Sequence, residues 1–258
     1  LFLSLYFSLS AQWERTNGPK GGFIHNVYSD GNTIYAGTYG GVFRSEDDGL
    51  SWIPANQNLS LRIINITKSE GRLFAATEAG VFVSNDEGQN WELVENGLPQ
   101  SKAIEVFSKD EIVLASFYQE GTFRSTDGGL SFEPLNFGNF DHVRLTRFAT
   151  NGESIYAIDR PYNIFQSVDK GMSWSKVTEA PEYFTEELIL VGNQLFAVSD
   201  DHFFRFNPTD STWTNSSSGL PQFGGLLGGI SLGTHLFIET YYGIYRSGDV
   251  GLSWEKIQ

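Results

Sequence analysis

The chain of 258 residues contains no cysteine, and it has few of the residues that mark several common kinds of site. Without cysteine it can form neither disulfide bonds nor thiolate metal sites. Its four histidines, at positions 25, 142, 202 and 235, lack the spacing of metal ligands. No Gly-x-x-x-x-Gly-Lys-Ser/Thr loop for nucleotide phosphates is present. We therefore expect neither a metal nor a cofactor.

Basic residues are also scarce, with 17 Lys and Arg against 31 Asp and Glu and a net charge of −14. Binding to nucleic-acid phosphates requires clustered Lys and Arg, so nucleic acid is excluded as a partner. No stretch reaches the ~20 apolar residues that span a bilayer. What the chain has is 40% hydrophobic residues, including 21 Phe, 11 Tyr and 6 Trp, which is enough for a large core.

The first eleven residues are uncharged and mostly apolar, and polar Gln12-Trp13-Glu14-Arg15 follows them. This boundary is typical of a secretory signal peptide, and no initiator Met or basic region precedes it. We expect residues 1–11 to be a truncated signal peptide and residues 12–258 to form the mature domain. A hydrophobic first strand is the alternative. The predicted location is secreted, at the cell surface or periplasmic.

An aromatic residue returns six times along the chain, at intervals of 39 to 42 residues. Such a period indicates one structural unit per repeat. The aromatic residues are Trp13, Trp52, Trp91, Phe132, Trp174, Trp213 and Trp254.

Five of these aromatic residues end the pattern Ser-x-Asp-x-Gly-x-x-Trp/Phe. The copies are Ser45, Asp47, Gly49 and Trp52; Ser84, Asp86, Gly88 and Trp91; Ser125, Asp127, Gly129 and Phe132; Ser167, Asp169, Gly171 and Trp174; and Ser247, Asp249, Gly251 and Trp254. A sixth copy, at residues 207–213, is one residue short and lacks the Gly. In each intact copy the Asp can accept backbone NH groups, and the Gly can adopt positive φ. The pattern predicts a structural hairpin turn.

The repeated pattern resembles the Asp-box, or BNR, repeat of sialidases, sortilin-type receptors, xyloglucan-cleaving glucanases and photosystem-assembly propellers. The resemblance covers nearly all of the chain after residue 11, and we expect an exported bacterial protein of this kind. It implies a β-propeller, but it does not imply an activity. A photosystem-assembly role would call for a basic groove, which the charge of −14 does not favour.

Three β-rich runs precede each turn, for example residues 23–29, 33–38 and 41–44 before the fourth strand near Trp52. Four short antiparallel strands per ~40 residues make one propeller blade, so the fold class is all-β. Seven aromatic fourth strands stand against six sets of first three strands. We expect a seven-bladed ring whose last blade is truncated at the C-terminus. A six-bladed ring with a spare strand at Trp13 is the alternative.

The resemblance implies that the repeated turns lie away from the binding face. That face is then built by the loops between second and third strands and by the loops that cross between blades. The first group of loops contributes Tyr39, Glu78, Tyr118, Glu120, Arg160, Tyr162, Asp200, Asp201, His202, Tyr241 and Tyr242. The crossing loops contribute Arg15, Lys20, Arg62, Lys102, Asn139, Asp141, His142, Glu182, Tyr183 and Phe223.

Aromatic side chains in this set suit stacking on sugar rings or contact with a peptide strand. We predict ligand binding by Tyr39, Tyr118, Tyr162, His202, Tyr241 and Tyr242. Many such loop residues on an acidic, aromatic-rich protein are simply a solvated rim.

Sialidase activity is not supported by the chain. It contains no Phe/Tyr-Arg-Ile-Pro string, and Arg44, Arg124 and Arg246 each directly precede a repeated turn. We expect these arginines to pair with neighbouring blades. A xyloglucanase-like glycosidase would use two carboxylates, for which Asp141, Asp200 and Asp201 are weak candidates, with Asp159 a further carboxylate. No catalytic residue is assigned.

The sequence therefore predicts an exported, monomeric binding or scaffold propeller that recognises a glycan or protein over the ring mouth. Whether it is an enzyme stays open, with the balance against catalysis. The alternative function is a glycoside hydrolase, xyloglucanase-like rather than sialidase-like.

Overall fold

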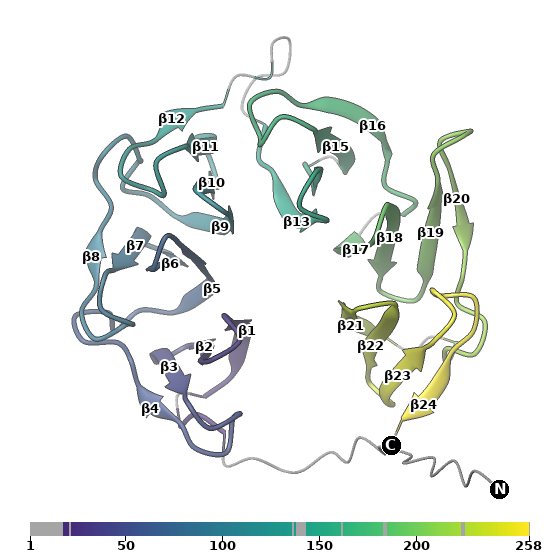
Figure 1. Ribbon diagram of the computed structural model, residues 1–258, viewed down its shortest axis with the longest axis horizontal. Helices are drawn as coiled ribbons and strands as arrows, with labels where there is room; N and C mark the ends of the chain where they lie inside the picture. Colours follow the sequence, from purple (N-terminus) through teal and green to yellow (C-terminus); the bar gives the residue numbers. More distant parts are fainter. Residues whose placement is uncertain are drawn as a thin grey trace, which may run out of the picture.

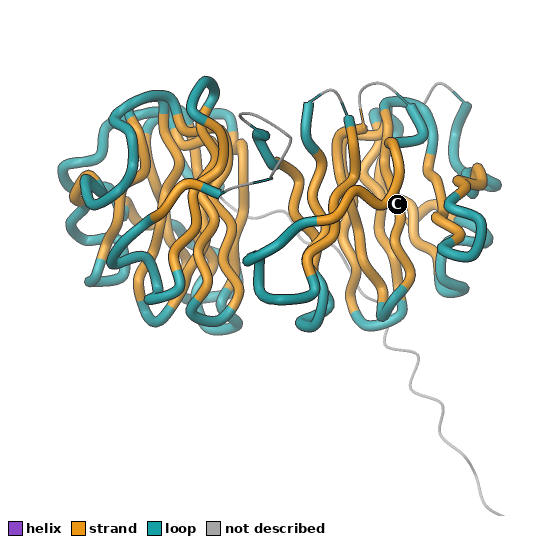
Figure 2. The backbone as a smooth tube through the Cα atoms, turned by 90° about the horizontal axis from the view of Figure 1, so that it is seen from above, coloured by secondary structure: helices purple, strands orange, loops and turns teal. Residues whose placement is uncertain are grey.

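Twenty-four β-strands form six separate four-stranded sheets, or blades, arranged around a common centre (Figure 1). The computed structural model describes residues 18–20, 22–135, 137, 143–160, 162–182, 185–222 and 225–257. Within these ranges no helix is present that is long and apolar enough to cross a membrane. Seen from the side, the strands stand next to one another in a flat ring, with loops on both faces (Figure 2).

Each blade consists of four consecutive strands, paired in the order of the chain. Blades 1 to 3 contain β1 Ile24–Ser29, β2 Ile34–Thr38, β3 Gly41–Ser45 and β4 Ile53–Pro54; β5 Ile63–Ser69, β6 Arg72–Thr77, β7 Gly80–Ser84 and β8 Glu92–Leu93; β9 Ala103–Lys109, β10 Ile112–Phe117, β11 Gly121–Ser125 and β12 Glu133–Pro134. Blades 4 to 6 contain β13 Thr146–Thr150, β14 Ile155–Ile158, β15 Asn163–Ser167 and β16 Ser175–Glu179; β17 Thr185–Val191, β18 Gln194–Ser199, β19 Phe203–Asn207 and β20 Thr212–Asn215; β21 Leu226–Leu232, β22 His235–Thr240, β23 Gly243–Ser247 and β24 Glu255–Ile257. The first strand of each blade lies at the centre of the ring and the fourth at its rim (Figure 1).

The prediction of seven blades is wrong, because the described chain forms six four-stranded sheets. Each aromatic residue from Trp52 to Trp254 directly precedes an outer strand or lies in one, and three paired strands come before it. The count of seven also included Trp13, which lies outside the described residues together with the predicted signal peptide at residues 1–11. An aromatic residue marks a blade only where three strands precede it, so the six-bladed alternative matches the structure.

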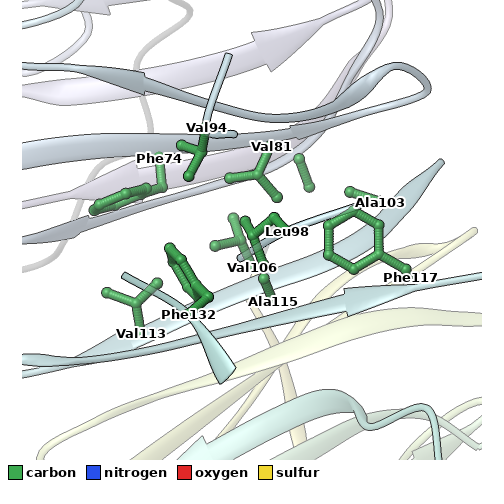
Figure 3. Packing of buried hydrophobic residues seen from close by; sticks show 11 residues of the cluster. Phe74, Val81, Val94, Leu98, Ala103, Val106, Val113, Ala115, Phe117 and Phe132 are labelled. Atoms are coloured by element: carbon green, nitrogen blue, oxygen red, sulfur yellow. The ribbon is translucent and has the colours of Figure 1, made fainter. Parts of the chain in front are cut away.

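The hydrophobic core lies between the blades, in five clusters that join each blade to the next. Between blades 2 and 3, Phe74 and Val81 face Val106, Val113 and Phe132, and all five are buried (Figure 3). Burying a phenylalanine of this kind contributes about 2 kcal/mol of stability. The blades are therefore held together mainly by packing between neighbouring sheets.

The ring has no equivalent cluster between blade 6 and blade 1 among the described residues. Val27 of β1 takes the register position of Ile66 in β5, yet it is 57% exposed where Ile66 is 3% exposed. Ile230 of β21 takes the position of Ile189 in β17, and it is 66% exposed where Ile189 is 4% exposed. The ribbons of the two blades are correspondingly apart (Figure 1).

The five intact Ser-x-Asp-x-Gly copies form the same hydrogen-bonded turn between the third and fourth strands. In the first, the Ser45 hydroxyl donates to Asp47 Oδ1 at 2.8 Å and accepts the Gly49 amide at 2.8 Å. The other oxygen of Asp47, Oδ2, accepts the hydroxyl of Ser51. These bonds satisfy the polar groups of the turn locally, so the turn needs no ligand to hold its shape.

Side chains next to these turns link neighbouring blades. The Trp91 indole donates to the carbonyl oxygen of Ala55 in blade 1 at 2.9 Å. Two of the arginines that precede the turns also cross between blades, since Arg44 donates to the Glu87 carbonyl and Arg124 to the Lys170 carbonyl. Arg246 instead pairs with Glu255 of its own blade.

Candidate functional site

The main pocket of the described structure opens where the second-to-third-strand loops and the blade crossings meet, which we call the mouth of the ring. Its volume is about 660 Å³, and it extends over blades 2 to 5. Its lining residues are Arg62, Ile64, Glu78, Lys102, Ile104, Tyr118, Arg144, Thr146, Arg147, Ile158, Asp159, Arg160, Tyr162, Thr185 and Glu186. None of them belongs to a Ser-x-Asp-x-Gly turn.

Short hairpins between second and third strands present side chains at the mouth. In blade 2 the Thr77 hydroxyl donates to the Gly80 carbonyl at 2.8 Å and accepts the Ala79 amide at 3.1 Å. The same Thr-to-Gly bond closes the hairpins of blades 1 and 6. These bonds leave the residue after the Thr at the tip of the hairpin, which is Glu78 in blade 2.

The blade crossings supply a repeated cation. Arg62, Lys102 and Arg144 lie 40 and 42 residues apart, each one or two residues before the first strand of blades 2, 3 and 4. Because successive blades repeat the same geometry, the three side chains reach the pocket from equivalent places.

Three guanidinium groups lie over tyrosine rings at the mouth. Arg144 lies 5.0 Å from the ring centre of Tyr118 and also donates to its carbonyl oxygen at 2.8 Å. Arg160 lies 5.6 Å from the ring centre of Tyr162. Arg62 lies 4.9 Å from that of Tyr39. Such cation–π contacts hold the arginines in place without neutralising their charge.

Most of the cations at the rim form no salt bridge within the part of the chain that the structure describes. Arg62 lies 3.9 Å from Glu78, but among the described residues Lys102, Arg144 and Arg160 form no salt bridge. The pocket as a whole is lined by five basic and three acidic side chains. A protein with a net charge of −14 thus concentrates positive charge at one place, which favours an anionic ligand.

At the floor of the pocket the arginine is, in contrast, surrounded by carboxylates. Arg147 of β13 lies 3.2 Å from Glu186 of β17 and 3.8 Å from Glu105 of β9. Burial raises the pKa of Glu105 to about 7, although the nearby Arg147 opposes this. Burial also raises the pKa of Glu187 to about 7. These two side chains change their charge near neutral pH.

The acidic side chain of Asp159 has a structural role. Its two carboxylate oxygens accept the backbone NH of Asn163 at 2.6 Å and the Asn163 side-chain amide at 2.9 Å. It is buried, and its hydrogen bonds shape the loop that carries Arg160 and Tyr162. Asp159 is therefore poorly placed to act as a general acid or base.

The structure brings together only some of the residues that the sequence singled out. Tyr118 and Tyr162 line the pocket, and Tyr39 is joined to it through Arg62. His202, Tyr241, Tyr242, Asp200 and Asp201 belong to blades 5 and 6 and do not line it. Candidates outside the described residues are Asp141, Arg15, Asn139, His142, Tyr183 and Phe223.

His202 forms a small polar cluster outside the pocket. Its Nδ1 lies 3.0 Å from Glu182 Oε1, and the Ser199 hydroxyl donates to Glu182 Oε2 at 2.7 Å. The hydroxyl is therefore bonded to the carboxylate instead of the imidazole. This arrangement lacks the serine-to-histidine hydrogen bond that activates a nucleophile.

Sequence reasoning did not identify Arg144, Arg147 or Glu186 as site residues. Arg144 had a detectable signal, because it continues the repeat spacing of Arg62 and Lys102. Arg147 and Glu186 had none, since they lie within inner strands, where alternation alone does not show which residues reach a pocket.

A family model described as a DUF6242 beta propeller domain matches residues 5–113, which is less than half of the chain. No curated protein matches the sequence.

Solved structures share the fold at low sequence identity. YCF48 from Cyanidioschyzon merolae has a TM-score of 0.72 and 16% identity, over 96% of this chain and 88% of that chain. A structure of YCF48 bound to D1 peptide has a TM-score of 0.67 and 13% identity, over 89% of this chain and 80% of that chain. The GH74 xyloglucanase from Xanthomonas campestris has a TM-score of 0.68 and 16% identity, over 96% of this chain and only 47% of that chain. At these identities the similarity establishes a common fold alone.

Proposed function

We propose that this protein is a non-catalytic binding propeller that holds an acidic peptide segment of a protein partner in the pocket at its mouth. The observation that carries the proposal is the group of three cations, Lys102, Arg144 and Arg160, that form no salt bridge with any residue that the structure describes. Bringing unpaired cations together costs free energy that an anionic ligand offsets when it binds.

The tyrosines favour a peptide over a neutral glycan. Stacking on a sugar requires an open ring face, and a guanidinium lies over one face of each of the rings of Tyr39, Tyr118 and Tyr162. Their aromatic faces thus serve to orient the arginines. A pocket that extends over four blades also suits an elongated ligand. The peptide bound to YCF48, a propeller of the same fold, is consistent with this kind of ligand.

The test is the binding of a fluorescein-labelled hexaglutamate peptide, measured by fluorescence anisotropy. Replacing Arg144 by Ala removes a charged donor, and we expect the Kd to rise at least about tenfold, which corresponds to about 1.4 kcal/mol. Lys176→Ala is the matched control, because Lys176 lies on the outer strand of the same blade and pairs with Glu179. We expect that change to alter the Kd less than about twofold.

Two further ligands separate the alternatives. Xyloglucan oligosaccharides test the neutral glycan and are assayed for reducing-end release, and polygalacturonate tests an acidic glycan. Binding of either in place of hexaglutamate would overturn the peptide assignment. Release of reducing ends from xyloglucan would show a glycosidase.

A further inference from the structure

Arg147 has an unusual backbone conformation for a residue within a strand. It has a φ of 55° and lies between Thr146 and Ala149, where the register of β13 with β14 shifts. A non-glycine residue in this region costs roughly 1–3 kcal/mol, and such strain often occurs at functional sites. The bulge places the guanidinium of Arg147 in the floor of the pocket.

The groups that surround Arg147 come from the inner strands of neighbouring blades. Glu105 lies on β9, and Glu186 and Glu187 lie on β17. From β5, the Asn65 side-chain amide donates to Glu105 Oε1 at 3.0 Å, which orients that carboxylate without adding charge. Lys102, Arg144 and Arg160 are the other cations of the pocket, and they lie at its rim.

Three carboxylates around one guanidinium leave the floor with excess negative charge when all of them are ionised. These carboxylates then repel an acidic ligand that reaches the floor, and they already neutralise the charge of Arg147. If Glu105 and Glu187 are neutral, the excess disappears, the repulsion of an acidic ligand is removed, and Arg147 is paired with Glu186 alone.

We propose that Arg147 is a conditionally available ligand-binding cation: Glu105 and Glu187 repel an acidic ligand from it when they are ionised, and they admit the ligand when they take up protons, with Glu186 as the carboxylate that stays paired with Arg147. The protein then binds acidic ligands more tightly as the pH falls through neutrality. This inference rests on the proposed function, because it concerns the same pocket.

The direction of this pH dependence follows from the buried carboxyl groups of Glu105 and Glu187. Burial favours the neutral form of Glu105 and Glu187 and raises the pKa of each to about 7. Both are therefore ionised at pH 8.5 and largely neutral at pH 6. A bound anion disfavours their ionised form further, so binding takes up protons and strengthens at low pH. Burial and the nearby Arg62 lower the pKa of His25, the histidine beside Tyr39, which favours its uncharged form.

The experiment measures the Kd of fluorescein-labelled hexaglutamate for the whole chain between pH 6.0 and 8.5 at constant ionic strength. The carboxyls of the probe stay ionised over this range, because free glutamate has a pKa of about 4.3. We expect the wild type to bind about tenfold more tightly at pH 6.0 than at pH 8.5, which corresponds to a coupling of about one pKa unit.

Two sets of variants identify the groups that cause the pH dependence of the Kd. Glu105→Gln combined with Glu187→Gln makes the floor permanently neutral, so we expect tight binding that does not change with pH. Arg147→Gln should bind more weakly at pH 6.0, and its pH dependence should move to higher pH, because Arg147 no longer favours the ionised form of Glu105 and Glu187. Glu153→Gln, on the exposed loop between β13 and β14, removes a carboxylate far from the floor and should keep the wild-type profile.

The outcomes separate this inference from the function on which it rests. Hexaglutamate binding that is equally tight at pH 6.0 and 8.5 overturns the inference and leaves the binding function standing. No binding at any pH overturns both. If the double variant does not fold, carbon-13 NMR of the wild type follows the carboxyl groups of Glu105 and Glu187. Their pKa must rise when hexaglutamate binds, and an unchanged pKa overturns the inference.

Discussion

At the scale of a single residue, Asp127 shows what one carboxylate does in a repeated turn. Its Oδ1 accepts the Ser125 hydroxyl and the amides of Leu130 and Ser131, and its Oδ2 accepts the Ser131 hydroxyl at 2.6 Å. These bonds hold the pKa of Asp127 well below its usual range. Replacement by Asn keeps the size but turns one acceptor into a donor.

We expect Asp127→Asn to lower the free energy of unfolding by about 1 kcal/mol at pH 7, since the turn is exposed and water competes for its groups. Because the folded pKa is depressed, the contribution is complete above the unfolded pKa of about 3.9 and is lost as the pH falls toward the folded value. Urea unfolding at pH 7 and pH 3 measures both effects.

Asp210→Asn is the control for this change. Asp210 belongs to the degenerate sixth copy, and its Oδ1 alone accepts both the amide and the hydroxyl of Thr212. An amide oxygen can replace that acceptor, so the substitution should be nearly neutral. Equal losses in the two variants would show that the intact turns gain nothing from the second carboxylate oxygen.

At the scale of an element, the crossing from β8 to β9 depends on the close approach of Gly97 to blade 3. Gly97 has a φ of 82°, and a Cβ at this position would lie 2.0 Å from the carbonyl oxygen of Phe132. Gly97→Ala must therefore move the crossing away from blade 3 or strain its backbone.

We expect Gly97→Ala to cost at least about 2 kcal/mol more than Gly71→Ala, measured by urea unfolding. Gly71 also has a positive φ, of 77°, but a Cβ there meets nothing within 4 Å, so its replacement reports only the backbone term of about 1 kcal/mol. If the two variants lose the same stability, backbone conformation alone requires a glycine at position 97.

The strands and turns also show how much of the fold could be predicted from the sequence. The Ser-x-Asp-x-Gly turns and the strand runs were predictable because they depend on local hydrogen bonds and alternation. The blade count was not, because Trp13 was counted as an outer strand from its spacing of 39 residues to Trp52, and it lies outside the described residues.

The candidate site could be predicted only in part, for a related reason. Tyr118 and Tyr162 were recognisable as loop aromatics, but the sequence did not show that Arg144, from the next blade crossing, lies over Tyr118 or that Arg160, from the same loop, lies over Tyr162. Whether a ring is free for a sugar depends on these tertiary contacts. The floor of the pocket depends on the side chains of three inner strands from different blades, which no local pattern brings together.

At the scale of the whole molecule, charge is distributed unevenly. The net charge of −14 repels an acidic ligand at long range, whereas the unpaired cations attract it at the mouth. The overall charge therefore does not exclude a basic groove, contrary to the expectation from the net charge alone. The arrangement of charged side chains at the mouth, and not the net charge, determines which ligand can bind there.

A last prediction follows from the arrangement of the six blades, because blades 1 and 6 each have one face that no other blade of the described residues covers. Ile230 of blade 6 and Ile189 of blade 5 occupy equivalent register positions, but only Ile189 is covered, by the face of the next blade. We expect Ile189→Ala to lower the free energy of unfolding by about 2–4 kcal/mol, as for other buried isoleucines. The same change at Ile230 should cost less than about 0.5 kcal/mol, since its side chain is already in water.

A second pair of positions tests the exposed face of blade 1 in the same way. Ile66→Ala removes buried contacts between blades 1 and 2, whereas Val27→Ala removes an exposed side chain from the equivalent position of blade 1. Urea unfolding of all four variants at a series of protein concentrations gives the comparison. A large loss at both Ile230 and Val27 would contradict the exposed faces and show that these surfaces are covered in solution. If that loss also depended on protein concentration, the cover would be a second copy of the chain, since only an intermolecular contact varies with concentration.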